Sequence, residues 1–384
     1  MKKILHTVNI AFAIPIVLGN QINYFNSIGY QVYIACTPSL ELNEIKKKWT
    51  FTSLEININR KITLFDDLIS IYKLIKFIKN NKIDIVVGHT PKGALISMIA
   101  SYIAGVNKRI YFRHGLVFET QKGFIKLFLI QVEKLTSKLS TKVICVSNSI
   151  LNQSKVLKIS KKDKLFLLNI GSCNGVDSEY KFNPELISKD IKDVYAKNMK
   201  LDHGDFIIGY IGRLSKDKGI NELIQSWILL KTQKCNANLK LILCGPYDER
   251  DPIDIITKKI IFSEKSIIYL GEIDNDNINY YYSFFDIFIL PSYREGFPTV
   301  ILEASSMKLP VITTKSTGCI DSIIENETGI FIEINKISIT KSIQFYKDNP
   351  NYISTHGNNG RNFIIDNFNQ KLIWNKLNEI YTTI

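Results

Sequence analysis

Short apolar runs rich in β-branched residues alternate with longer, helix-like stretches along the whole chain. In the first half they predict strands over 4–10, 31–37, 83–89, 109–114, 142–147 and 165–170, and in the second half over 206–212, 240–245, 267–271, 287–292, 311–314 and 329–332. The helices predicted between them include 68–82, 124–139, 220–232 and 299–308. Continuous apolar strands separated by helices are typical of parallel sheets covered on both faces. We therefore predict an α/β protein with two doubly wound, Rossmann-like domains and ligand sites at the carboxyl ends of the strands.

The domain boundary is expected within residues 171–205, where a turn-rich segment is followed by a polar, charged stretch. A chain of 384 residues is also too long for one typical core. We predict a first domain over 1–190 and a second over 200–368. A C-terminal helix at about 369–384 is expected to pack back on the first domain.

The positive charge is concentrated in the first half. The net charge is +13, and residues 1–200 hold 30 Lys and Arg against 14 Asp and Glu, whereas the remaining 184 hold 19 against 22. Nucleic acid could explain a basic half, but no nucleic-acid-binding signature accompanies it, and we predict no such partner. An anionic membrane face or a pyrophosphate-linked acceptor explains the charge at least as well.

Cysteine usage and the N-terminus indicate a cytoplasmic protein. The six cysteines, at positions 36, 145, 173, 235, 244 and 319, lack metal-ligand spacing and predict buried, reduced thiols. Two lysines and an apolar stretch open the chain as in a signal peptide, but His6, Thr7 and Asn9 interrupt the stretch and no cleavage site follows. No apolar run of about 18 residues occurs, so we predict no membrane-spanning segment.

The richest chemical signal lies near the C-terminus, in Glu295-Gly296-Phe297-Pro298-Thr299 and the second carboxylate Glu303. The segment joins a predicted strand to a predicted helix. Backbone N–H groups at a helix start favour a phosphate, and carboxylates beside them can hold hydroxyl groups. Glu303 follows about two turns into the helix. Such a set suits a nucleotide-sugar, which carries a diphosphate between two polyhydroxylated rings. An ordinary loop with incidental surface glutamates is the alternative.

Two cations follow the first strand of the second half. Arg213 comes directly after Gly212, and Lys218 follows five residues later, before a helix begins. The planar guanidinium suits phosphate oxygens, and the ammonium adds a point charge. Two solvated surface cations are the alternative interpretation.

Together these segments resemble the E-x7-E and G-R-L-x-x-x-K-G elements of the retaining family-4 glycosyltransferases, which have the GT-B fold with an interdomain cleft. The resemblance covers essentially the whole chain. It implies that Gly212, Arg213 and Lys218 contact the donor diphosphate. It implies that Glu295 and the backbone of Gly296–Thr299 hold the donor sugar, and that Glu303 takes the ribose hydroxyls. The nucleotide-sugar, with a UDP-sugar favoured, is then a substrate, and no cofactor is expected.

The first half carries further elements of this resemblance. His114 ends a predicted strand, is expected at the interdomain cleft, and resembles the family's catalytic histidine beside the donor sugar; a structural histidine is the alternative. His89-Thr90-Pro91-Lys92 resembles an element of capsular and O-antigen transferases, which implies that His89 and Lys92 shape the acceptor site. The chain lacks the Gly-Gly pair that many members carry after the first strand, and Gly19 is expected to meet the donor phosphates in its place.

Asp274-Asn275-Asp276 matches the D-x-D of metal-dependent transferases, but it lies in a polar turn of the second half. We interpret these aspartates as turn and helix-capping residues and predict no metal site. Retention could proceed by double displacement on an enzymic carboxylate, or by front-face attack with the donor phosphate taking the acceptor proton. No carboxylate pair stands out as acid and nucleophile, so we favour the second.

The predicted acceptor is a glycan linked to undecaprenyl pyrophosphate in bacterial surface polysaccharide synthesis. Lys122, Lys126, Lys134 and Lys138 accompany phenylalanines in and just before the predicted helix 124–139, a pattern that fits either an interfacial helix on anionic lipid or an ordinary core helix. With the basic first half, it favours peripheral attachment to the inner face of the cell membrane. A non-hydrolysing UDP-sugar epimerase and a non-catalytic carbohydrate-binding protein remain as alternatives.

Overall fold

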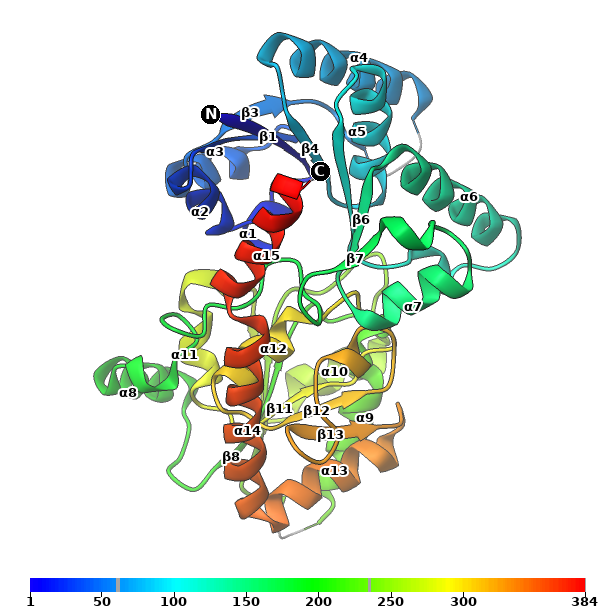
Figure 1. Cartoon of the computed structure of the whole chain (residues 1–384). Coiled ribbons are helices and arrows are strands. Elements are labelled where there is room, and N and C mark those ends of the chain that lie inside the picture. The colour runs from blue at the N-terminus through cyan, green and yellow to red at the C-terminus, as the bar shows by residue number, and fades with distance from the viewer. Residues whose placement is uncertain (60–62, 234–235, 384) are drawn as a thin grey trace. The chain divides into compact units, whose positions relative to one another are not determined.

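The computed structural model describes residues 1–59, 63–233 and 236–383, and the chain divides into two compact units (Figure 1). The first unit holds Met1–Asn174 and the C-terminal helix α15 (Gln370–Thr383), and the second holds Gly175–Asn369. Residues 175–190, predicted for the first domain, group with the second unit instead. The reason is that Phe182 is buried in the second core, where its carbonyl accepts a hydrogen bond from Ser306 Oγ at 2.7 Å.

The first unit is built on a seven-stranded parallel sheet with the order β3-β2-β1-β4-β5-β6-β7. Its strands are β1 (Lys2–Thr7), β2 (Tyr30–Cys36), β3 (Thr52–Glu55), β4 (Ile85–Gly88), β5 (Lys108–Arg113), β6 (Lys142–Cys145) and β7 (Leu165–Leu167). Only β3 escaped prediction, because this edge strand is partly exposed along its whole length and carries no apolar run. The order reverses between β1 and β4, which is where a doubly wound sheet places its ligands.

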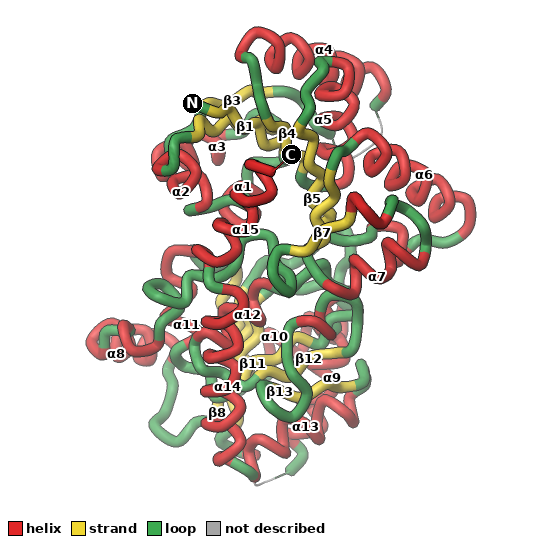
Figure 2. Tube along the Cα trace, in the orientation of Figure 1, coloured by secondary structure: helices red, strands yellow, loops and turns green. Residues whose placement is uncertain are grey.

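Helices cover both faces of this sheet, as Figure 2 shows by colour. They are α1 (Ala13–Val17), α2 (Gln21–Ser27), α3 (Leu40–Lys48), α4 (Leu64–Asn81), α5 (Pro91–Ile103), α6 (Gly123–Leu139), α7 (Asn148–Val156) and α15, with short 3₁₀ turns η1 (Val117–Thr120) and η2 (Lys162–Lys164). Helix α5 packs between α4 and α6, and its small and apolar residues are buried. Helix α15 joins this unit because Ile373, Leu377 and Tyr381 are buried, with the Tyr381 ring 5.2 Å from that of Phe25.

The second unit repeats the architecture with a six-stranded parallel sheet of order β10-β9-β8-β11-β12-β13. All six strands were predicted: β8 (Phe206–Ile211), β9 (Leu239–Cys244), β10 (Ile267–Gly271), β11 (Ile287–Leu290), β12 (Val311–Thr314) and β13 (Gly329–Ile332). The helices are α8 (Lys189–Met199), α9 (Ile220–Lys231), α10 (Ile255–Ser263), α11 (Ile278–Tyr282), α12 (Thr299–Ser306), α13 (Lys336–Asp348) and α14 (Pro350–Phe368), with 3₁₀ turns η3 (Pro184–Leu186), η4 (Lys216–Lys218), η6 (Asn275–Asn277) and η7 (Cys319–Asp321). Here the order reverses between β8 and β11.

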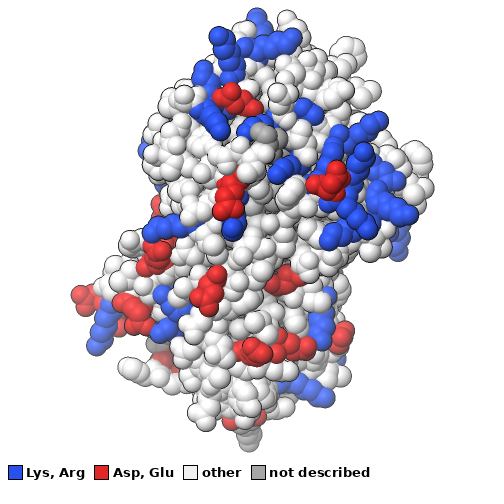
Figure 3. All heavy atoms as spheres, viewed as in Figure 1, with Lys and Arg blue, Asp and Glu red and all other residues white. Residues whose placement is uncertain are grey.

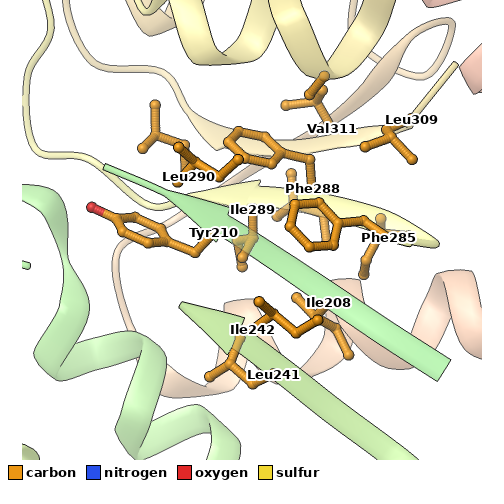
Figure 4. Packing of buried hydrophobic residues seen from close by; sticks show 14 of the residues in the cluster. Ile208, Tyr210, Leu241, Ile242, Phe285, Phe288, Ile289, Leu290, Leu309 and Val311 are labelled. Carbon is orange, nitrogen blue, oxygen red and sulfur yellow. The ribbon is translucent and has the colours of Figure 1, made fainter. Parts of the chain in front are cut away.

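The core of the second unit fixes these two central strands against each other. Figure 4 shows Ile208 and Tyr210 of β8 beside Phe288 and Ile289 of β11, all fully buried. Strands buried on both faces form nearly continuous apolar runs, which is why the sequence pattern revealed these two so clearly. The loops that leave β8 and β11 therefore start from a rigid base.

Five cysteines lie within the described residues and none of these forms a disulfide, while Cys235 lies outside them. In the part of the chain that the structure describes, no helix combines the length and the apolar composition needed to cross a membrane.

Candidate active site

The site is built where the order of the second sheet reverses, on loops from the carboxyl ends of β8 and β11. Lys218 lies at the end of η4, just after β8, and Glu295 lies in the loop between β11 and α12. Lys218 Nζ and Glu295 Oε1 are 2.5 Å apart, and only 13% and 17% of the two side chains is exposed. The structure thus brings together two predicted site residues and leaves an edge of each accessible.

Backbone contacts between the two loops hold this pair in place. The Tyr293 amide donates to the carbonyl of Asp217 at 2.9 Å, and Ser292 Oγ donates to the same carbonyl at 3.2 Å. Gly219 has φ +69°, and an added Cβ would collide with the Pro291 carbonyl. Only glycine fits easily at such a position, so the tight approach of the loops explains the glycine after Lys218.

A third loop, which follows β12, contacts the backbone of Glu295. The Glu295 amide donates to the Thr317 carbonyl at 2.9 Å. Gly318 has φ +77°, and a Cβ there would meet the carbonyl oxygens of Glu295 and Gly296. The position of the Glu295 carboxylate is therefore set by three loops from neighbouring strands.

Helix α12 begins directly after this loop. Its N-cap is Pro298, which makes no side-chain cap, and Thr299 is its first residue. The ring of Phe297 lies 5.3 Å from that of Phe368, so the side chain anchors the loop to the core. The start of α12 offers backbone donors and the positive end of the helix dipole, as an anionic ligand requires.

Glu303 lies in the middle of α12 and has its own neighbours. Its carboxylate accepts a hydrogen bond from Tyr282 Oη at 2.8 Å. Burial raises the pKa of Glu303 to about 7, while the positive charge of Lys181 and the Tyr282 hydroxyl act in the opposite direction. A carboxyl group whose pKa lies near 7 can accept hydrogen bonds from hydroxyl groups, and such bonds favour its charged form.

Arg213 is held by a residue that the sequence analysis missed. Its guanidinium forms an ion pair with Asp248, which also binds Arg250 through Nε at 3.1 Å and Nη2 at 3.1 Å. Asp248 is 5% exposed and Arg213 43%, so the carboxylate is fixed while the arginine keeps an open face. Asp248 lies in the loop after β9, and its signal in the sequence was a charged run following a buried strand and Gly245-Pro246. Gly212, predicted to contact the donor, donates its amide to the Cys244 carbonyl at 2.9 Å.

In the first unit, three histidines meet at the carboxyl ends of neighbouring strands. His6 lies in β1, His89 directly follows β4 and His114 directly follows β5. His89 is 1% exposed, and both of its ring nitrogens lie 3.0 Å from other histidines. Both nitrogens of the His89 ring therefore have histidine partners, and the role of His89 in shaping the acceptor site stays a prediction. His6 was absent from the predicted site.

Burial also decides the charge of this cluster. It lowers the pKa of His6 to about 3 and that of His114 to about 4. The pKa of His89 is lowered well below its ordinary value by burial and by the neighbouring His114 and His6. All three imidazoles are consequently neutral at physiological pH.

The other predicted residues of the first unit lie around the same edge of the sheet. Lys92, in the first turn of α5, pairs with Asp67 at 2.8 Å, and only 13% of its side chain is exposed. Gly19 joins α1 to α2 with φ +46°. The structure adds Asn9, whose Oδ1 accepts from the Gly93 amide at 3.1 Å and so fixes the start of α5. Acceptor binding by Lys92 and donor binding by Gly19 stay predictions.

Comparison with known proteins identifies the family. The model described as "Glycosyl transferase 4-like" matches residues 4–147, and that described as "Glycosyl transferases group 1" matches residues 192–363. The capsular polysaccharide biosynthesis glycosyltransferase CapM of Staphylococcus aureus is 33% identical over 383 residues, covering 100% of this chain and 97% of CapM. The chain belongs to the group 1, family-4-like glycosyltransferases.

Further relatives agree with this assignment. This chain is 28% identical over 324 residues to the UDP-Gal:alpha-D-GlcNAc-diphosphoundecaprenol alpha-1,3-galactosyltransferase of Escherichia coli. The aligned region covers 84% of this chain and 81% of the relative. The crystal structure of a glycosyltransferase from Rickettsia africae ESF-5 superimposes with a TM-score of 0.80 at 24% identity, covering 99% and 97% of the two chains. The GT-B class, with its two doubly wound α/β units, is confirmed.

In this glycosyltransferase the Asp274-Asn275-Asp276 sequence forms a capped turn. Asp274 Oδ1 accepts a hydrogen bond from the Asp276 amide at 3.1 Å and caps η6. This confirms the capping role predicted for Asp274.

Proposed function

We propose that this glycosyltransferase moves a sugar, with retention of configuration, from a UDP-sugar to a glycan linked to undecaprenyl diphosphate. The observation that carries the proposal is the Lys218–Glu295 pair beside the start of α12, with Arg213 on the same loop after β8 as Lys218. Cations, a carboxylate and helix-start amides match the diphosphate and hydroxyls of such a donor. The relatives named for capsule synthesis and for a diphosphoundecaprenol acceptor support the substrate class and a role in bacterial surface polysaccharide synthesis.

In this mechanism the chain stabilises charge on the leaving diphosphate. Lys218 and Arg213 contact the phosphate oxygens, whose negative charge grows as the bond from the sugar's anomeric carbon to the phosphate breaks. Glu295 and the backbone of Gly296–Thr299 hold the sugar, and Glu303 accepts the ribose hydroxyls. The acceptor hydroxyl attacks on the face from which the phosphate leaves and gives its proton to a phosphate oxygen.

We further propose that the two cations supply this charge without a divalent ion. Asp248 and Glu295 hold Arg213 and Lys218 in fixed positions, so that their charges are in place before the reaction begins. Activity is then expected to survive EDTA. Complete loss in EDTA, restored by manganese or magnesium, would overturn this part of the proposal.

We also propose that the enzyme works at the inner face of the cell membrane, through the first unit. On α6 the side chains of Phe124 and Leu127 are 81% and 61% exposed, and on α4 that of Phe65 is 85% exposed. The inner side of α6 is fixed by Glu133, which is buried and binds Arg113 Nε at 3.0 Å. The helix thus presents apolar side chains outward instead of packing them into the core.

The charge around these helices fits anionic lipid. Lys and Arg side chains gather over the α6–α7 region in Figure 3. The exposed lysines of α6 and its N-cap are Lys122, Lys126, Lys134 and Lys138. Each basic residue near an anionic surface contributes about 1 kcal/mol, and salt screens it. Vesicle sedimentation should therefore show salt-sensitive binding to anionic vesicles that weakens when these four lysines become glutamine. Equal binding to neutral vesicles would contradict an electrostatic contribution to membrane attachment.

The transfer reaction itself is tested with a panel of UDP-sugars and a synthetic diphosphoundecaprenol-linked N-acetylglucosamine acceptor. We expect an acceptor-dependent release of UDP, and NMR of the product should show the anomeric configuration of the donor. Inversion would refute retention. Isomerisation of the donor without an acceptor would indicate an epimerase, and UDP-sugar binding without turnover on this acceptor would favour a carbohydrate-binding protein.

A further inference from the structure

The three histidines of the first unit form a continuous hydrogen-bonded chain. His6 Nδ1 faces His89 Nε2 at 3.0 Å, and His89 Nδ1 faces His114 Nε2 at 3.0 Å. The ring nitrogens face one another in pairs instead of converging on one point, as the ligands of a metal ion would. His89 also stacks on Phe112, with ring centroids 5.0 Å apart and an angle of 15° between the planes. The central ring is therefore fixed in orientation as well as in position.

Neutral imidazoles in such a chain cannot choose their protonation independently. Each neutral ring carries one N–H and one lone pair, and each hydrogen-bonded contact needs one of each. If His6 donates from Nδ1, then His89 must accept at Nε2 and donate from Nδ1, and His114 must carry its proton on Nδ1. If His114 donates from Nε2, the same logic places every proton on Nε2. Every other combination sets two protons or two lone pairs against each other.

We propose that His6 and His89 are positioning residues that hold His114 in one defined tautomer through this chain. All three rings then share one tautomer, so the Nδ1 of His114 is a donor if the protons lie on Nδ1 and an acceptor if they lie on Nε2. The inference rests on the proposed sugar transfer in one respect, the expectation that His114 acts as a catalytic histidine in that reaction. It assigns to His89 a task other than acceptor binding, and it gives a role to His6.

The physical benefit is that His114 enters the reaction already oriented. An isolated, exposed imidazole exchanges between two tautomers, and the wrong one offers a lone pair where a proton is needed, or the reverse. The low pKa values of the three rings keep a third proton state, the imidazolium, out of the mixture. When the tautomer is fixed in advance, no turnover begins with the unsuitable form of His114.

The decisive experiment is ¹⁵N NMR of the unliganded wild-type protein with labelled histidine, because it separates protonated from unprotonated ring nitrogens. The chain has five histidines, and the two outside the cluster, His203 and His356, serve as internal references. We expect the three cluster rings to be neutral at pH 7 and to show one common tautomer. A ring in a different tautomer from its neighbour, or an imidazolium in the cluster, would overturn the proposal. The result does not depend on transfer activity, so it stands apart from failure of the proposed function.

Kinetics of variants at the central ring give the second test. His89→Phe keeps an aromatic ring against Phe112 but removes both nitrogens. We expect kcat to fall about 10- to 100-fold with a nearly unchanged KM for the donor, as for a partner that orients another group. His89→Gln, which retains one donor and one acceptor, should recover part of the rate. Wild-type kcat in a folded His89→Phe protein would refute a positioning role, and a variant that fails to fold leaves the decision to the wild-type spectrum.

Discussion

The two lysines of η4 offer a matched pair of substitutions for testing the donor site. Lys218 and Lys216 lie two residues apart in the same short turn, and each forms one ion pair. Lys218 binds Glu295 at 2.5 Å with 13% of its side chain exposed, whereas Lys216 binds Asp254 at 3.1 Å with 52% exposed. Replacing each lysine in turn by alanine removes one positive charge from the same element. Lys218→Ala removes it from the candidate site, and Lys216→Ala removes it from the exposed surface.

The expected magnitudes differ because the two environments differ. A charge-assisted contact to a developing charge is worth about 1.5–3 kcal/mol, which corresponds to about a 10- to 150-fold loss of kcat/KM for Lys218→Ala. An exposed pair such as Lys216–Asp254 contributes about 0–1 kcal/mol to stability and makes no proposed contact with the donor. Lys216→Ala should therefore keep kcat/KM within about twofold of wild type, because its charge is largely screened.

The assay compares both variants in kcat/KM for the UDP-sugar, in UDP affinity by calorimetry and in thermal unfolding. Lys218→Ala should lose both turnover and UDP affinity, while its melting temperature stays high enough for assay. If Lys218→Ala unfolds, Lys218→Met keeps most of the buried stem and repeats the test. Equal kcat/KM in the two alanine variants would refute the reasoning, since it would mean that Lys218 acts no differently from a surface lysine.

Three further outcomes are expected. Asp248→Asn should lower kcat/KM about tenfold, because Arg213 and Arg250 both lose the buried carboxylate that orients them; unchanged turnover would show that Arg213 needs no such support. Glu303 has a folded-state pKa of about 7, above the unfolded value, so its charged form costs stability as pH rises above about 4.3. Urea unfolding should accordingly show Glu303→Gln gaining stability over wild type between pH 4 and 8, by up to about 3 kcal/mol, and a difference independent of pH would contradict the shift. Phe124→Ser should weaken binding to anionic vesicles without lowering the melting temperature, because this side chain is 81% exposed, and wild-type binding would remove Phe124 from the membrane face.

The sequence alone predicted most of the strands and several residues of the candidate site. Buried parallel strands form nearly continuous apolar runs, so twelve of the thirteen strands within the described residues could be placed from the pattern, and the half-exposed edge strand β3 was missed. The loop with Glu295 and the loop with Lys218 were recognisable because each combines charged residues with glycine between a strand and a helix. These are local signals, carried by residues that are neighbours in the chain.

Only the tertiary structure decided which of these residues meet. Lys218 and Glu295 are 77 residues apart, and His6 and His89 are 83 apart; each pair forms because the sheet order places their strands side by side. The same pairing showed that His89 is enclosed by other histidines, and that Arg213 is held by Asp248. A residue's chemistry can be inferred from its type and its loop, whereas its partners depend on strand order and burial, which arise from packing across the whole sheet.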